Sequence, residues 1–399
     1  MKNKTKLKLG ISGAVAVFGL LAFVAFPYIG GKLVIKEQYT AAKTVAVDRK
    51  LESEMLFNNE LNSSVFTDKL VEEIEKAQKT INVAIYSVDS EVIRDSLFAA
   101  AERGVKIQVV SDSKKRNGHA TLFSNPPVNF AMKDVPEQRK KKVESYMHNK
   151  FAVIDAGEEN QTVLTGAWNW TNIQEKIDPT YLLVTSDQEI VSAYMDEFER
   201  LFNGEHTTKK FKNETYKPFY RDIQYTDSNL EIWFSPGIGT NSIKNRIVDE
   251  IKTAEKSIDI MVWQVTDKEI IDELLIAAKN GVSITMLLDD EKMYEKDSAV
   301  NYMIEKIMAL DIQNIELYSD ETREVSVEGY QNLNSFLHHH MLLVDNKSVL
   351  FGTNNWGSRG AYVNDENIIV TNNKYIVESF IDTFKFQKDE LADGKIEIL

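Results

Sequence analysis

Histidine is the residue whose placement in this sequence most clearly points to chemistry. The chain of 399 residues has six histidines, and three of them stand side by side in SFLHHHMLLVD, from Ser335 to Asp345. A fourth, His148, opens the stretch HNKFAVID, which ends at Asp155. In both stretches the histidines come just before an apolar run that is typical of a buried strand. The sequence therefore predicts imidazole groups at the ends of two buried strands.

The spacing in each stretch places two nitrogen-bearing side chains on one face of a strand. Side chains alternate across a strand, so His338 and His340 share a face, as do His148 and Lys150. Two imidazoles at one phosphorus suit phosphodiester cleavage without metal or cofactor: one attacks to form a phosphohistidine, and the other protonates the leaving oxygen. Lysine supplies positive charge for the phosphate oxygens. A zinc site formed by His148, His338 and His340 is the less favoured alternative.

Both stretches lie at matching places in an internal repeat. Residues 69–112 match residues 246–289, and residues 181–202 match residues 367–387. The first pair is predicted to form helix, strand, helix and strand, and the second pair strand and helix. A repeat of this length indicates two similar α/β domains, and related sites then meet at the interface between them.

The two halves share a motif that resembles the signature of the phospholipase D superfamily. That signature is His, any residue, Lys, four residues and Asp, followed by Gly-Ser, any residue and Asn. Ala167 stands where Ser is usual in the first copy, and His340 stands where Lys is usual in the second. The resemblance covers nearly all of residues 63–390. The matching positions are His148, Lys150, Asp155, Gly166 and Asn169 in the first half and His338, Asp345, Gly352, Thr353 and Asn355 in the second.

The resemblance implies a fold and a set of roles. The fold is α/β: two repeated phospholipase D-like α/β/α sandwich domains with mixed sheets, with the active site formed within one chain and no obligate protein partner. The His, Lys (or His340) and Asp positions of the motifs are implied to be catalytic, and Asn169 and Asn355 to contact the phosphate. We expect His340 to be a weaker substitute for lysine that gains charge as the pH falls towards about 6.

The family also places an acidic residue downstream of each motif to orient the histidine. Glu366 occupies this position in the second half, and its counterpart in the first half is Thr180. Asp178, two residues earlier on the same strand face, is an alternative. The resemblance favours His148 as the attacking residue, whereas the retention of Glu366 favours His338, and both assignments stay open at this point.

The N-terminus carries a candidate membrane segment. Four lysines in MKNKTKLK precede an uncharged run from Leu9 to Gly31, which is long enough as a helix, at about 1.5 Å per residue, to cross a hydrocarbon core of about 30 Å. We expect a transmembrane anchor with the catalytic domains outside the cytoplasm; a cleaved signal peptide and a secreted protein are the alternative. The expected divisions are anchor 1–31, stalk with some helical character 32–62, domain 63–205, linker 206–228 and domain 229–399.

Composition bears on the substrate. The formal net charge is −14 and the chain has no cysteine, which excludes disulfides and thiolate chemistry. An acidic surface does not attract polyanions over long range. Together with the candidate anchor, this favours phospholipid at a membrane over nucleic acid. The predicted function is a membrane-anchored phosphodiesterase of the phospholipase D type that hydrolyses or transfers phospholipid headgroups. The alternatives are a nuclease of the same superfamily and a catalytically weakened binding or scaffold protein.

Overall fold

The computed structural model describes most of the chain from residue 41 onwards. The described residues are 41–59, 63–113, 116–135, 145–212, 219–237, 241–320, 324–327 and 330–396. The predicted membrane anchor at residues 1–31 lies outside them. Within the described ranges, no helix combines the length and the apolar character needed to cross a bilayer.

The first half of the chain forms a seven-stranded mixed sheet, the first sheet. β3, β4 and β5 are parallel, and the other neighbouring strands pair antiparallel. In spatial order the strands are β2 (Glu54–Phe57), β8 (Tyr181–Thr185), β7 (Thr162–Gly166), β6 (Lys150–Ile154), β3 (Thr80–Ile85), β4 (Lys106–Asp112) and β5 (Phe130–Val135).

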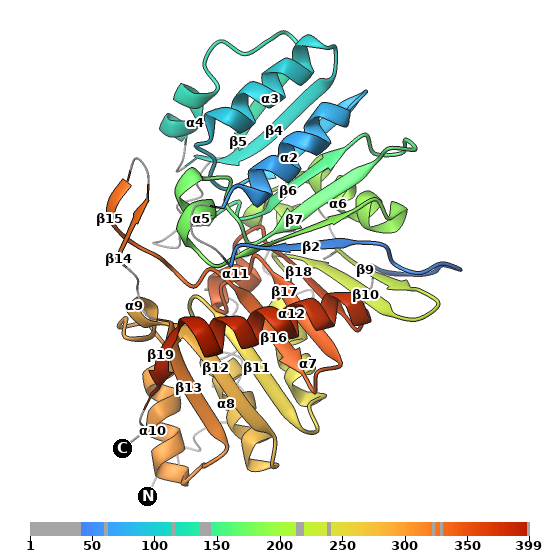
Figure 1. The fold of residues 1–399 in the computed structure, drawn as a ribbon. Helices are drawn as coiled ribbons and strands as arrows, with labels where there is room; N and C mark the ends of the chain where they lie inside the picture. Colours follow the sequence, from blue (N-terminus) through green and yellow to red (C-terminus); the bar gives the residue numbers. More distant parts are fainter. Residues whose placement is uncertain are drawn as a thin grey trace, which may run out of the picture.

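The second half forms a ten-stranded mixed sheet, the second sheet, below the first in Figure 1. Its core repeats the pattern of the first: β11, β12 and β13 are parallel, and β16 and β17 continue antiparallel. In spatial order the strands are β1 (Ala41–Ala46), β9 (Phe219–Gln224), β10 (Asn229–Phe234), β18 (Asn367–Thr371), β17 (Ser348–Gly352), β16 (His340–Val344), β11 (Ser257–Val262), β12 (Ser283–Asp289), β13 (Ile315–Asp320) and β19 (Ala392–Lys395).

The predicted repeat is confirmed at the level of elements. Helix, strand, helix and strand follow one another as α2 (Val65–Lys76), β3, α3 (Glu91–Glu102) and β4, and again as α7 (Ile243–Lys252), β11, α8 (Lys268–Lys279) and β12. Gly104 and Gly281 have φ values of 99° and 95° just after α3 and α8. This left-handed conformation ends a helix at low cost only for glycine.

Long helices cover both faces of each sheet. α2 and α3 pack on the outer face of the first sheet, and α7, α8 and α10 (Val300–Leu310) on the outer face of the second. α6 (Gln188–Phe202) and α12 (Lys374–Phe386) lie between the sheets, so the described chain stacks in five layers. The shorter elements are α4 (Arg116–Leu122), α5 (Asn172–Ile177), η2 (Thr207–Lys212), α9 (Asp290–Met293), β14 (Glu324–Val327), β15 (Tyr330–Asn334), α11 (Ser358–Tyr362) and η3 (Gln387–Leu391).

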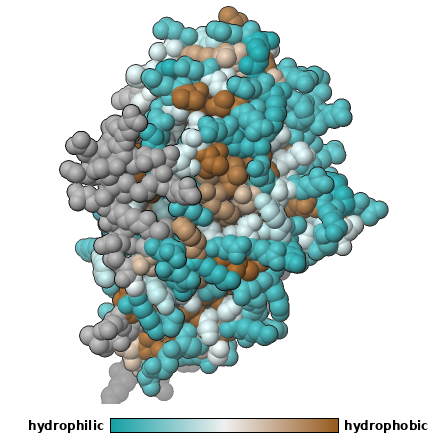
Figure 2. Space-filling model, in the orientation of Figure 1, coloured by the Kyte–Doolittle hydropathy of each residue, from teal (hydrophilic) through white to brown (hydrophobic). Residues whose placement is uncertain are grey.

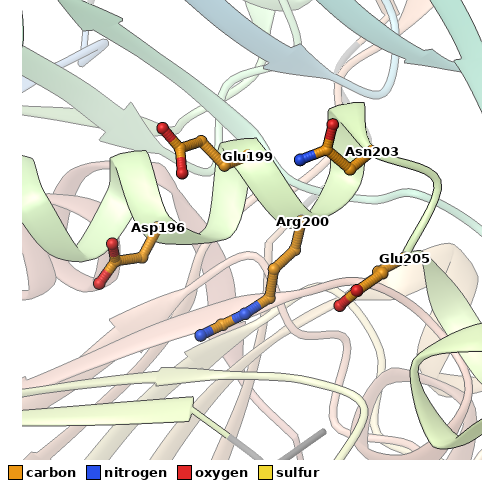
Figure 3. Close-up of a pocket in the computed structure, with 5 residues that line it drawn as sticks. All are labelled: Asp196, Glu199, Arg200, Asn203 and Glu205. Carbon is orange, nitrogen blue, oxygen red and sulfur yellow. The ribbon is translucent and has the colours of Figure 1, made fainter. Parts of the chain in front are cut away.

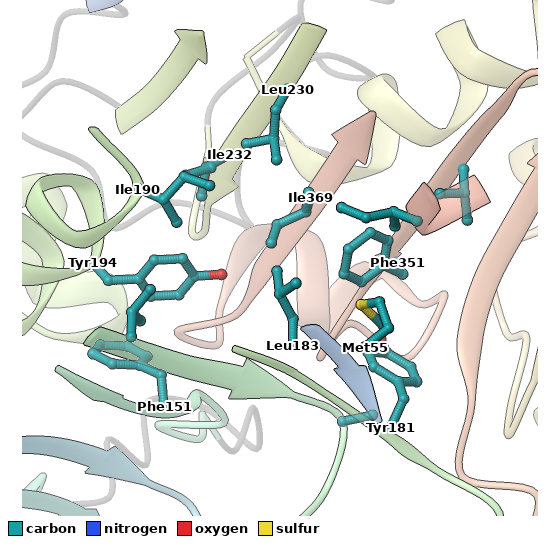
Figure 4. Close-up of a cluster of buried hydrophobic side chains, with 14 of the residues drawn as sticks. Met55, Phe151, Tyr181, Leu183, Ile190, Tyr194, Leu230, Ile232, Phe351 and Ile369 are labelled. Carbon is teal, nitrogen blue, oxygen red and sulfur yellow. The ribbon is translucent and has the colours of Figure 1, made fainter. Parts of the chain in front are cut away.

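The core between the sheets belongs to both halves. Figure 4 shows Phe151 and Leu183 of the first sheet in one cluster with Phe351 and Ile369 of the second. The Tyr181 hydroxyl also donates a 2.8 Å hydrogen bond to the Gly352 carbonyl oxygen of the other half. Burying an apolar side chain of this size contributes about 1.5–3 kcal/mol. The two halves are therefore joined by a continuous core. The outer surface in Figure 2 is mainly hydrophilic, with small separate hydrophobic areas.

Two segments differ from the sequence-based division. The helical character expected for the stalk is wrong for residues 41–57, which contain β1 and β2. β1 pairs with β9 of the second sheet and β2 with β8 of the first, because short apolar stretches there complete sheet edges. The expected linker likewise includes η2 and β9. Both connecting segments are thus integral parts of the two sheets.

Candidate active site

Both histidine motifs begin at the same end of their sheets. Lys150, the first residue of β6, pairs with Ile85 at the end of β3. His340, the first residue of β16, pairs with Val262 at the end of β11. His148 comes just before β6 and is 8% exposed. The repeat therefore places the two motifs at equivalent sheet ends, where the carboxyl ends of the parallel strands also lie.

Each histidine is fixed by the backbone of the other half. The backbone N–H of His148 donates to the Asp365 carbonyl oxygen at 2.8 Å, and the N–H of His338 donates to the Pro179 carbonyl oxygen at 3.0 Å. Asp365 and Pro179 are matching residues of the repeat. The chain thus exchanges equivalent contacts between its halves, and each histidine lies at the interface between them. The charge of His148 contributes to lowering the pKa of His338, after burial and Lys150.

Glu366 orients His148, and not the histidine of its own half. Its Oε2 lies 2.8 Å from His148 Nδ1, and the carboxyl group is fully buried. Thr353 Oγ1 donates to the same oxygen at 2.7 Å, and Asn364 Nδ2 donates to Oε1 at 2.9 Å. With its proton on Nδ1, the imidazole presents Nε2 as a nucleophile or base. The sequence-based argument that Glu366 favours His338 is therefore wrong, because the contact crosses between the halves.

The His338 side of the site lacks this support. The position that matches Glu366 is Thr180, and the position that matches Thr353 is Ala167. His338 Nδ1 has no hydrogen-bond partner among the described residues, nor has the buried Thr180 Oγ1. Burial, followed by the charges of Lys150 and His148, lowers the pKa of His338 well below its usual range. His338 is therefore neutral at physiological pH before substrate binds.

Asp178 does not replace the missing carboxylate. Its Oδ1 accepts the backbone N–H of Phe336 at 2.9 Å, two residues before His338. The matching Asn364 accepts the N–H of Tyr146 at 3.0 Å, two residues before His148. Burial raises the pKa of Asp178 to about 8. The described contacts of Asp178 thus fix the backbone that leads into the second motif.

Lys150 and His340 occupy equivalent buried positions with different charge. Lys150 Nζ donates to the His148 carbonyl oxygen at 2.8 Å, and burial lowers its pKa to about 7, although Glu366 acts to raise it. Burial lowers the pKa of His340 well below its usual range, with His338 and Lys150 adding to the effect. The expected gain of charge on His340 near pH 6 is therefore wrong for the free protein. Neither ring nitrogen of His340 has a partner among the described residues.

The two motif asparagines also carry unsatisfied atoms. Asn169 Oδ1 and Asn355 Oδ1 are buried, and neither has a hydrogen-bond partner in the described part of the chain. Buried polar atoms are normally paired. Unpaired buried atoms also occur elsewhere in the described chain, for example on both ring nitrogens of His339. Those of His338, His340 and the two asparagines, however, all belong to residues that the motif implies for catalysis and phosphate binding, and a bound polar ligand would supply their partners.

The motif aspartates, Asp155 and Asp345, lie at the opposite ends of β6 and β16 from the motif histidines. Asp155 follows β6 at its far end and accepts the backbone N–H groups of Gln78, Lys79 and Thr80 at 2.7, 2.7 and 2.8 Å. Asp345 does the same for residues 255–257. Both have φ near 50°, which aspartate tolerates better than most residues. The implied catalytic role of Asp155 and Asp345 is therefore wrong in this structure: they fix the start of β3 and β11 instead.

The motif positions Gly166 and Gly352 require glycine for a steric reason. A Cβ atom on Gly166 would collide with the Tyr181 carbonyl oxygen, and one on Gly352 with the Asn367 carbonyl oxygen. These close approaches bring β7 against β8 and β17 against β18, just before the asparagine turns.

Sequence reasoning missed a further matched pair: Asp112 and Asp289 end β4 and β12, and each accepts the N–H of the residue before a motif histidine, at 2.8 and 3.1 Å. The repeat alignment already paired these two residues.

Other histidines have structural contacts. His339 stacks against Tyr181 and Phe57, with ring centroids 5.6 and 6.4 Å apart, and faces away from its two neighbours. No group of three or more potential ligands in the described ranges is arranged to bind a metal ion. A polar surface pocket of about 320 Å³ lies at the end of α6 (Figure 3) and contains none of the motif residues. Its lining residues are Asp196, Glu199, Arg200, Asn203 and Glu205.

Comparison with known proteins assigns the family. Residues 70–202 and 247–387 match the family described as "Cardiolipin synthase, PLD-like domain". These segments contain both motifs and more than half of the chain. The chain belongs to the phospholipase D superfamily, a family of phosphodiesterases and phosphatidyltransferases.

Individual relatives are more distant. The chain is 30% identical over 127 residues to a mitochondrial cardiolipin hydrolase of Xenopus tropicalis, covering 32% of this chain and 56% of the relative. It is 24% identical over 170 residues to a phospholipase D of Rickettsia prowazekii, covering 43% of this chain and 73% of the relative. The alignments with the cardiolipin hydrolases span only about half to three fifths of those proteins.

Solved structures share the fold at low sequence identity. A phosphatidylserine synthase of Haemophilus influenzae superimposes with a TM-score of 0.63 at 13% identity, covering 86% of this chain and 87% of the other. A polyphosphate kinase of Porphyromonas gingivalis superimposes with a TM-score of 0.56 at 15% identity, covering 87% of this chain and 48% of the other. Similarity at this level establishes the fold that both halves build together.

Proposed function

We propose that this protein is a phosphodiesterase of the phospholipase D type that hydrolyses or transfers phospholipid headgroups, with His148 as the nucleophile. The observation that carries the proposal is the hydrogen bond between His148 Nδ1 and Glu366 Oε2, at 2.8 Å. With the ring proton on Nδ1, towards the carboxylate, Nε2 is the nitrogen available for attack. An imidazole oriented through its second nitrogen by a carboxylate is the arrangement that nucleophilic and general-base catalysis require.

The reaction divides between the two sides of the site. His148 Nε2 attacks phosphorus, a P–N bond forms, and the P–O bond to the leaving alcohol breaks. His338 donates a proton to the leaving oxygen and then takes one from water or an acceptor alcohol. The oxygen of that water or alcohol attacks phosphorus, a new P–O bond forms, and the P–N bond breaks, which regenerates His148. The negative charge of the bound phosphodiester favours the protonated form of His338. Lys150, His340 and the two asparagines then surround the phosphate oxygens.

The proposed substrate class is phospholipid. The relatives named above include cardiolipin hydrolases and a phospholipase D. The formal net charge of −14 disfavours long-range attraction of nucleic acid, whose binding depends on a basic surface. Recognition of a single phosphodiester needs only local positive charge, which Lys150 supplies. We further propose that residues 1–31 anchor the protein in a membrane with the catalytic halves outside the cytoplasm, which brings the site to lipid substrate.

A substrate panel tests the proposal. Full-length protein in detergent is incubated separately with phosphatidylcholine, phosphatidylglycerol, cardiolipin and single-stranded DNA, and released headgroup or cut DNA is measured. The expected result is headgroup release, or exchange with added ethanol, from at least one lipid, and none with the His148→Ala variant. Cleavage of DNA alone contradicts the lipid assignment and favours a nuclease. Binding without turnover of any substrate favours a scaffold protein.

A further inference from the structure

A buried lysine from the connecting segment lies behind His148. Lys210 belongs to η2, between the two segments that match the family, and its side chain is 0% exposed. Its Nζ pairs with Glu197 of α6, with Asp365 Oδ1 at 2.8 Å, and donates to the Ser235 carbonyl oxygen at 2.9 Å. One ammonium group therefore joins the connecting segment, the first half and the second half.

Asp365 links this lysine to the nucleophile. Its carbonyl oxygen accepts the His148 N–H at 2.8 Å, and its own N–H donates to the Tyr146 carbonyl oxygen at 2.9 Å. The next residue, Glu366, accepts the hydrogen bond from the His148 imidazole. The position of Asp365 therefore determines both the backbone and the ring contact of His148.

The connecting segment holds Asp365 with a backbone group as well. Thr207 N–H donates to both carboxylate oxygens of Asp365, at 2.8 and 2.9 Å. Thr207 has a φ of 49°, a conformation that is unfavourable for a β-branched residue. Such a conformation persists only where the surrounding contacts require it. The connecting segment thus binds the Asp365 carboxylate through the backbone amide of Thr207 and the ammonium group of Lys210.

The positive charge of Lys210 is needed to hold Asp365 in this position. Glu197 and Asp365 are buried within reach of the same ammonium, and burial raises the pKa of Asp365 to about 7, while Lys210 acts to lower it. Without Lys210, one carboxylate must take up a proton or leave. The other groups facing this cluster are Arg200, 3.5 Å from Glu197 Oε2, and Lys209, 3.1 Å from His206 Nε2; burial, Lys209 and Lys210 lower the pKa of His206 to about 4.

The arrangement acts on one half of the site. The residue that matches Asp365 is Pro179, which offers the same carbonyl contact to His338 but has no carboxylate. We propose that Lys210 is a positioning residue for His148: it fixes Asp365, and through it the Glu366–His148 contact. This inference rests on the proposed function in assigning the attack to His148.

The test compares two buried cations of the connecting region. Lys210→Met removes the ammonium, and Lys210→Arg keeps a positive charge. The control is Arg221→Met: Arg221 is 2% exposed and pairs with Glu189 and Asp196 at 2.8 and 3.0 Å. Activity is measured with bis(4-nitrophenyl) phosphate, a soluble phosphodiester, from pH 5 to 9. The signal of the His148 Nδ1–H proton, which is hydrogen-bonded to Glu366, is followed by NMR in parallel.

The expected outcomes differ between the variants. Lys210→Met removes the cation that holds Asp365, so the Glu366–His148 contact loosens, the His148 Nδ1–H signal exchanges faster with water, and kcat at neutral pH falls about tenfold or more with little change in KM. Lys210→Arg keeps this signal and most of the activity, and Arg221→Met loses stability without changing either. An unchanged Nδ1–H signal in folded Lys210→Met, or an equal change in Arg221→Met, overturns the proposal.

A second variant covers failure to fold. Asp365→Asn keeps the side-chain shape but removes the charged partner of Lys210 and weakens the acceptor of the Thr207 N–H, so it should loosen the Glu366–His148 contact in the same way as Lys210→Met. An unchanged His148 Nδ1–H signal overturns the proposal where Lys210→Met does not fold. The NMR measurement needs no substrate. A protein that cleaves no phosphodiester therefore refutes the proposed function, while the Nδ1–H signal still decides the role of Lys210.

Discussion

Glu366, from the second half of the chain, accepts a hydrogen bond from the His148 imidazole of the first half at 2.8 Å. Because this contact crosses between the halves, it shows which of the two histidines each departure from the motif affects. The departures Ala167, Thr180 and His340 come from different parts of the sequence, yet the crossed contacts assign all three to the side of His338. The His148 side keeps the full set. One fully supported imidazole and one unsupported imidazole favour a fixed division of labour over two interchangeable histidines.

The Glu366 carboxylate should matter for rate more than for binding. Glu366→Gln keeps the shape but weakens the preference for a proton on His148 Nδ1, so Nε2 is less often available for attack. We expect kcat to fall by about 10²–10⁴-fold with little change in KM. The control is Glu175→Gln, which alters another buried carboxylate, bonded to the Phe66 and Thr67 N–H groups at 2.8 and 2.7 Å. Steady-state kinetics of the folded variants measure both, and equal losses would refute the orienting role.

The motif aspartate should be structural. Asp155→Ala leaves three backbone N–H groups without their acceptor, so the free energy of unfolding should fall by about 2–3 kcal/mol. Its folded-state pKa is depressed, so this contribution is present above the unfolded value of 3.8 and is lost as the pH falls below it. Urea unfolding at pH 7 and pH 3 measures the difference. The kcat of the folded variant should stay within about twofold of the wild type, and a far larger loss would restore a catalytic role.

Much of the fold could be predicted from the sequence, because the repeat can be recognised in the order of the residues alone. The apolar runs of β3 and β11 and the glycines after α3 and α8 appear at fixed offsets, and each has a local cause. The paired motifs likewise predicted that His148 and His338 serve one site. Periodicity and local backbone preference suffice for features of this kind.

What the sequence did not reveal depends on contacts between distant residues. Nothing in the order of residues says whether Glu366 faces His338 or His148, because that follows from how the two sheets pack. The resemblance to the family motif implies a catalytic role for Asp155, although the length of β6 places this residue at the opposite end of the strand from His148. Lys210 lay in a segment without periodicity, where no pattern marks a single buried charge. Only its contacts reveal it.

The buried Lys150 should lower the free energy of unfolding while being required for turnover. Burial lowers the pKa of the Lys150 ammonium to about 7 in the folded protein, against an ordinary value of 10.5. Between these values the unfolded chain binds more protons, so the free energy of unfolding rises with pH across this window and the full cost of burial applies below it. Lys150→Met should therefore raise the free energy of unfolding at pH 7 by about 1–4 kcal/mol, and by less at pH 10, while abolishing turnover. Urea unfolding at both pH values checks this, and a destabilised variant at pH 7 would contradict it.

The triple histidine gives the last prediction. His340 occupies the position of the phosphate-binding lysine, but its buried imidazole is neutral at pH 6 and above. His340→Lys adds a cation whose proton the bound phosphate stabilises, so inorganic phosphate should bind about tenfold more tightly at pH 7. Activity should be preserved or raised, and the pH profile should extend to the alkaline side.

Two neighbours provide the controls for this variant. His338→Ala should abolish turnover, because it removes the proton donor for the leaving oxygen. His339→Phe should leave phosphate affinity unchanged, because this ring stacks on Tyr181 and Phe57, away from the site. Calorimetric titration with phosphate and the pH profile of kcat measure the three variants. If His340→Lys folds and binds phosphate but does not turn over, the imidazole of His340 has a chemical role of its own, since added positive charge alone favours the bound phosphate.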